Sequence, residues 1–181
     1  MHTGLKTYLH KTKTMIIEVA DYDGIISLVN AKSYKTFVDE DWQLEQLKAH
    51  FLEQMNLNTL IVWQTNNFEG GNWKVRFTSI EGEEVAHSSF TAVLEVTDGE
   101  LYLADYTDLT MAAQFKEYKI PAAQHENQKI TLENGRYLIK VKRLFDPEEE
   151  LAEEDIAFEI VLTKTAELNN NPVTEIFWGN F

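Results

Sequence analysis

Short runs of β-branched and aromatic residues, separated by turn signals, are the feature of this sequence that most limits its fold. Residues 73–78 alternate apolar and polar side chains, as a strand with one buried face does. The dipeptides typical of tight turns are Asp23-Gly24, Asp98-Gly99 and Asn134-Gly135. This spacing predicts about eight to ten strands in a mainly β fold, either an antiparallel β-sandwich or a partly closed barrel.

The positions of the turns also predict which strands form hairpins. Each turn signal lies between two β-rich runs, and a tight turn in that position ordinarily joins two antiparallel neighbours. The expected hairpins join 14–20 to 25–29, 60–65 to 73–78, 90–96 to 101–104, 130–132 to 137–145, and 137–145 to 157–163. A last, aromatic strand is expected over 173–181.

One segment has the period of a helix instead of a strand. Leu44, Leu47, Phe51 and Met55 recur at helical spacing, and carboxylates at 39–41 favour the positive end of a helix dipole. The sequence therefore predicts a single amphipathic helix over 39–56.

Length and composition favour one soluble domain. The chain has 181 residues, no cysteine and an ordinary apolar content of 44%. Residues 1–13 are polar and predict a loose N-terminal extension, and 14–181 a single β-rich domain. Without cysteine there is no disulfide or thiolate metal site, and no apolar run is long enough to span a membrane, so a cytoplasmic protein without membrane association is expected.

The charge is strongly acidic and unevenly distributed. The chain carries 30 acidic and 16 basic residues, a net charge of −14. Residues 144–181 hold ten carboxylates and one lysine. Such a field repels nucleic acid and anionic membranes and attracts basic partners, so no nucleic-acid binding is expected.

The acidic segment 146–155 is the principal candidate site. The strand pattern on both sides of it predicts a displayed loop at the tip of a hairpin or a short surface helix. Closely spaced carboxylates can imitate phosphates and dock on a basic cleft, so the segment favours a non-catalytic protein that binds a basic partner, such as an inhibitor or immunity-type regulator. The alternative is a solvated loop that aids solubility. The candidate contact residues are Glu148, Glu149, Glu150, Glu153, Glu154 and Asp155.

Aromatic residues support a second hypothesis. Trp63 and Trp73 flank one predicted hairpin and could stack on a sugar ring or another small ligand, in a carbohydrate-binding or small-molecule-binding module, although aromatics at alternating strand positions more often form the core. A homodimer through an exposed strand edge also remains open.

Catalysis has little support in the sequence. The five histidines are scattered without metal-motif spacing, and no nucleotide loop or nucleophile motif occurs. They are His2, His10, His50, His87 and His125. Asp105 and Asp108 could act as acid and base, but a sequence this rich in carboxylates contains such pairs by chance. We therefore expect no cofactor, no metal and no catalytic residue.

Overall fold

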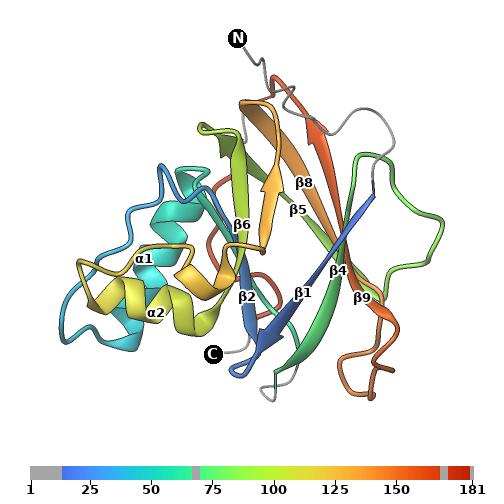
Figure 1. The fold of residues 1–181 in the computed structure, drawn as a ribbon, viewed down its shortest axis with the longest axis horizontal. Coiled ribbons are helices and arrows are strands. Elements are labelled where there is room, and N and C mark those ends of the chain that lie inside the picture. Colours follow the sequence, from blue (N-terminus) through green and yellow to red (C-terminus); the bar gives the residue numbers. More distant parts are fainter. Residues whose placement is uncertain (1–13, 67–69, 168–170, 180–181) are drawn as a thin grey trace, which may run out of the picture.

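Two β-sheets pack face to face, and helices cover the outer face of one of them (Figure 1). The computed structural model describes residues 14–66, 70–167 and 171–179. Within these residues the strands form two separate sheets of five and four strands, which confirms the predicted β-sandwich over a closed barrel. The predicted extension 1–13 lies outside the described residues.

The larger sheet, sheet A, is mixed. Its strands, in spatial order, are β1 (Met15–Asp21), β4 (Gly71–Thr78), β9 (Ile156–Lys164), β8 (Gly135–Arg143) and β5 (Ser88–Val96). β4 and β9 are parallel and the other neighbours are antiparallel.

The smaller sheet, sheet B, is antiparallel throughout. Its strands, in spatial order, are β3 (Leu60–Gln64), β2 (Ile25–Val29), β6 (Glu100–Asp105) and β7 (Lys129–Thr131).

Apolar side chains fill two layers, one on each face of sheet B. The first lies between the sheets and is rich in aromatics, including Trp63, Phe77 and Phe158. The second lies between sheet B and the helices α1 (Leu44–Asn56) and α2 (Tyr106–Gln114). Because sheet B is covered on both sides, every residue of β2 and β3 is buried, whereas β1 and β4 alternate between buried and more exposed residues over most of their length.

Most of the predicted hairpins are wrong, because the chain changes sheet at the turn. β1 and β2 flank Asp23-Gly24, yet β1 pairs with β4 in sheet A and β2 pairs with β3 and β6 in sheet B. The same change of sheet occurs from β3 to β4, from β5 to β6 and from β7 to β8. Gly24 and Gly99 have the positive φ angles, 75° and 74°, that their turn signals require. The turns were thus placed correctly and the pairing was not.

The hairpin between β8 and β9 is confirmed. Its strands pair from Tyr137 and Lys164 to Arg143 and Phe158, which leaves the acidic segment as the connecting loop. The chain from 144 to 155 forms turns and no helix, so the loop form of the two predicted alternatives is the one observed.

The helices differ from prediction at two places. α1 begins at Leu44 and not near 39, because Gln43 and Gln46 form a capping box there. The second helix, α2, was missed: Asp105 caps it by accepting a hydrogen bond from the backbone N–H of Asp108 at 2.8 Å. No helix in the described part of the chain is long and apolar enough to cross a membrane.

The predicted C-terminal strand is reduced to a single bridge. Phe177 pairs in parallel with Trp63 at the free edge of β3, and the backbone N–H of Gln64 donates to the carbonyl of Phe177 at 3.0 Å. Residues 180–181 of the predicted strand lie outside the described residues. The segment therefore covers one sheet edge without extending the sheet.

The charge of the capping residue Asp105 lowers the stability of the fold, and this can be tested. Burial, and then the charges of Asp108 and Asp21, raise the pKa of the Asp105 carboxyl, so its ionised form destabilises the fold as the pH rises through the folded-state value. Asp105→Asn keeps a good cap and removes the charge. We expect a melting temperature about 2 °C higher near neutral pH, with the gain vanishing in acid below the unfolded-state value. Thermal unfolding across pH tests this, and a loss of stability of equal size at every pH would contradict it.

Candidate functional site

The centre of the acidic loop packs against the core, and the acidic side chains on either side of it are exposed. Leu151 packs against the inter-sheet core and anchors the loop. On either side of it, turns close through hydrogen bonds from the N–H of Glu149 to the carbonyl of Asp146 and from the N–H of Asp155 to the carbonyl of Ala152, each 3.0 Å long. One partly buried leucine thus anchors a loop whose acidic side chains are exposed.

All six predicted contact residues are exposed: Glu148, Glu149, Glu150, Glu153, Glu154 and Asp155. Between Glu149 and Asp155, no carboxylate of the loop lies within 4.0 Å of a Lys, Arg or His nitrogen of the described chain. The negative charge of the loop is therefore displayed to solvent and largely uncompensated by ion pairs.

Acidic residues elsewhere in sheet A are used differently. Glu159 is only 1% exposed, and its carboxylate pairs with Lys142 at 3.0 Å and with Arg76 at 2.8 Å. Glu81 and Glu84, from the segment that crosses the outer face of this sheet, pair with the same two cations. These carboxylates stabilise the sheet, which distinguishes them from those of the loop.

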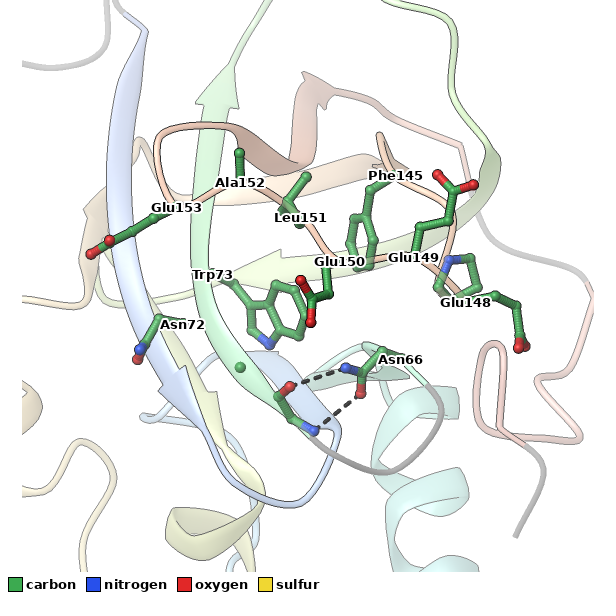
Figure 2. A pocket seen from close by; sticks show the side chains of 13 residues that line it. Asn66, Asn72, Trp73, Phe145, Glu148, Glu149, Glu150, Leu151, Ala152 and Glu153 are labelled. Atoms are coloured by element: carbon green, nitrogen blue, oxygen red, sulfur yellow. Dashed lines mark hydrogen bonds between the residues drawn. The ribbon is translucent and has the colours of Figure 1, made fainter.

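A cavity of about 350 Å³ lies between the acidic loop and the start of β4 (Figure 2). Glu150 extends toward the space bounded by Trp73 and Asn66 (Figure 2). The cavity thus has carboxylates on its loop side and aromatic and amide groups on its strand side. Its lining residues are Asn66, Gly70, Gly71, Asn72, Trp73, Phe145, Pro147, Glu148, Glu149, Glu150, Leu151, Ala152 and Glu153.

Asp21 holds the tryptophan wall of this cavity in place. Its Oδ2 accepts hydrogen bonds from the indole N–H of Trp73 at 3.2 Å and from the hydroxyl of Thr65 at 2.8 Å. Its Oδ1 accepts from the backbone N–H groups of Asp23 and Ile25 in the turn that joins the two sheets. Sequence reasoning missed this role, although an Asp two residues before Asp23-Gly24 is typical of such a turn.

The faces of the Trp73 ring are covered by other side chains, so only the edge of the ring can border the cavity. The side chain is 5% exposed, and the ring stacks on Phe145 at a centroid distance of 5.2 Å and meets the edge of Phe158 at 5.9 Å. A Cβ at position 71 would lie 2.8 Å from the ring, so Gly71 is needed for this close approach. Trp73 is therefore an apolar wall of the cavity.

The structure does not bring Trp63 to this cavity. Trp63 is fully buried between the sheets, where it contacts Phe90 and Phe158, and it does not line the cavity that Trp73 lines. The two tryptophans predicted as a stacking pair thus occupy different environments, because β3 and β4 belong to different sheets.

Asp105 and Asp108, the pair considered as acid and base, make hydrogen bonds within the fold. Asp108 is 1% exposed and accepts a hydrogen bond from the Tyr118 hydroxyl at 2.6 Å, and its other oxygen lies 2.7 Å from Nδ1 of His125. Burial and the Asp108 carboxylate raise the pKa of Tyr118. These contacts tie the segment after α2 to the helix itself. Among the described residues, no group of three or more His, Asp or Glu side chains could hold a metal ion.

Comparison with known proteins supports the architecture. No protein-family model and no curated protein matches the sequence. A solved structure described as crocagin biosynthetic gene J is similar with a TM-score of 0.57 and 14% sequence identity, over 85% of this chain and 98% of that chain. A second, ComJ from Bacillus subtilis, described as an inhibitor of the DNA degrading activity of NucA, has a TM-score of 0.46 and 10% identity, over 86% and 99% of the chains. The first likeness shows a shared fold, and at these identities neither assigns a function.

Asp21 provides a test of how the cavity wall is supported. In Asp21→Asn an amide takes the place of a carboxylate that accepts four hydrogen bonds. The amide NH₂ cannot accept a hydrogen bond, so if it faces the indole N–H of Trp73, two donors oppose each other and that hydrogen bond is lost. We expect a loss of about 2 kcal/mol in the free energy of unfolding, measured with urea, and a shifted tryptophan emission. Asp23→Asn, an exposed change in the same turn, is the control and should alter stability little. Equal effects of the two changes would show that the carboxylate does not support the wall.

Proposed function

We propose that this chain is a non-catalytic binding protein whose acidic loop, residues 146–155, docks on a basic surface of a protein partner. The observation that carries the proposal is the contrast between the loop and sheet A. Glu159 has two cations beside it, whereas Glu149, Glu150 and Glu153 are exposed and form no ion pair within the described chain. Unpaired exposed carboxylates can meet an external cation without first breaking an internal pair.

The charge of the whole chain supports the same partner class. A net charge of −14 steers basic proteins toward the surface and repels nucleic acids, which carry the same sign. The loop concentrates this field at the end of a rigid hairpin, where Leu151 keeps it in position. Association should therefore be fast and should weaken as salt screens the attraction.

The cavity beside the loop fits a single long basic side chain of the partner. Trp73 and Phe145 provide apolar surface for the methylene stem of a lysine or arginine, and Glu150 lies where it can meet the charged head. The volume, about 350 Å³, is within the range of pockets that accept small ligands. We infer that such a side chain anchors the partner and that the other loop carboxylates surround it.

Charge reversal tests the use of the loop. The experiment is affinity capture from the native lysate at low salt, with the captured proteins identified by mass spectrometry. We expect the unmodified chain to retain a basic protein and the variant Glu149→Lys/Glu150→Lys/Glu153→Lys to lose it. The matched control, Glu40→Lys/Glu117→Lys/Glu126→Lys, changes the net charge equally at exposed positions outside the loop.

The two variants separate a local contact from a general charge effect. Retention by the control and loss by the loop variant support the proposal, provided that circular dichroism shows both to be folded. Equal loss in both variants would mean that net charge alone attracts the partner. Retention by the loop variant would contradict the proposal.

A second pair of changes tests the anchor cavity. Glu150 lines the cavity, whereas Glu154 is an exposed residue of the same loop that does not line it. Against the captured partner we expect Glu150→Gln to weaken affinity about tenfold and Glu154→Gln about twofold, because a charge that faces an inserted cation is more desolvated than one on the rim. Titration calorimetry measures both, and equal effects would show that the loop binds as a diffuse charged surface without an anchor.

A further inference from the structure

Three buried donors at one end of the sandwich have no hydrogen-bond partner within the described chain. They are Nε of Arg143, Oγ of Ser88 and the indole Nε1 of Trp63. Buried polar groups are rarely left unpaired, so three such donors on neighbouring residues favour a bound molecule or ion that the chain itself does not supply.

Strand pairing places Ser88 beside Arg143, and ring contacts place Trp63 near both residues. Ser88 and Arg143 are directly opposite each other in the β5–β8 ladder, so their side chains lie on the same face of sheet A. Phe158 is paired with Arg143 on the other side, in β9. From sheet B, Trp63 reaches both Phe158 and Phe90, with ring centroids 6.2 Å and 6.1 Å away. Trp63 thus contacts the residue beside Arg143 and the residue two positions after Ser88.

Arg143 brings a positive charge to this place that forms no close ion pair, although the carboxylate of Asp146 acts on it from the start of the acidic loop. Its side chain is 6% exposed, and no carboxylate in the described residues lies within 4.0 Å of its nitrogens. Its Nη2 donates to the backbone carbonyl of Gln64 at 2.8 Å, and burial lowers the pKa of the guanidinium to about 10. The adjacent Lys142, on the opposite face of β8, has the buried carboxylate of Glu159 at 3.0 Å.

The C-terminal segment closes the site from outside. The ring of Trp178 lies over the guanidinium, 4.2 Å from the ring centroid, and Trp178 has a φ angle of 58°, which is unusual for a residue other than glycine. Phe177 stacks on Phe90 at 3.9 Å. A bulky residue held in the left-handed region is strained, and such strain tends to occur at binding sites.

We propose that Arg143, Ser88 and Trp63 form a binding site for a small anion of the size and charge of chloride. Arginine and tryptophan N–H groups can only donate, so they require an acceptor, and the guanidinium requires a negative charge. A water molecule finds acceptors in the Ser88 oxygen and in backbone carbonyls such as that of Gln64, but it brings no negative charge to the guanidinium. The three donors lie outside the acidic loop, although the charge of Asp146 at its start acts on Arg143, and the site does not depend on the binding of a partner.

Anion exchange tests the site. Because a ligand that binds only the folded chain raises its melting temperature, the unmodified protein should melt at a higher temperature in sodium chloride than in sodium gluconate of equal ionic strength. Arg143→Met should abolish this difference. Lys119→Met, which removes one positive charge at an exposed position after α2, is the control and should retain it. Chloride and gluconate stabilising the unmodified protein equally would overturn the proposal.

A second variant and a direct readout cover the case in which Arg143→Met does not fold. Ser88→Ala removes one donor with little change of shape, and we expect it to lower chloride affinity roughly fivefold in ³⁵Cl NMR line-broadening titrations. In crystals grown in sodium bromide, an anomalous peak within hydrogen-bonding distance of Arg143 Nε would confirm the site. A water molecule at that position without anomalous signal would refute it.

Discussion

Burial of sheet B on both faces is the constraint on which the other parts of this structure depend. β2 and β3 are buried along their whole length, so sheet B needs one apolar cover from sheet A and another from α1 and α2. Sheet A then needs only one apolar face, and its outer face can carry charge. The β8–β9 loop contributes Leu151 to the packing of the inter-sheet core, and its acidic side chains stay exposed.

Ion pairing separates the charges that maintain the fold from those that are available to a partner. Asp21, Asp108 and Glu159 are buried, and each makes several hydrogen bonds or ion pairs. A buried carboxylate must be satisfied in this way, because its desolvation costs more than an unpaired position can tolerate. The loop carboxylates are exposed and have no such requirement. Arg143 is a buried cation with no carboxylate within 4.0 Å among the described residues, and it is for this reason that an anion site is proposed there.

The sequence predicted individual elements better than their pairing. Alternation in 73–78 and 137–145 identified β4 and β8, and the helical period of Leu47, Phe51 and Met55 identified most of α1. The turns at Gly24 and Gly99 were located but assigned to hairpins, since a turn that reverses the chain within one sheet and a turn that crosses to a second sheet use the same residues. The sequences differ only slightly: 15–21 contains the charged residues Glu18 and Asp21, whereas the polar residue of 25–29 is the small Ser27, as in a strand covered on both faces.

The sequence alone determined the mainly β class, the position of the turns and the exposure of the acidic loop, because these follow from local periodicity and from the cost of burying many like charges. The choice of a sandwich over a barrel came from the tertiary structure. Only the tertiary structure decided which strands are neighbours, that Trp63 is core while Trp73 borders a cavity, and that Asp21 fixes that wall. These features depend on contacts between residues far apart in the chain, such as Asp21 with Trp73 or Trp63 with Phe158. Local propensity does not encode such contacts, since they arise from how two buried layers fill the same space.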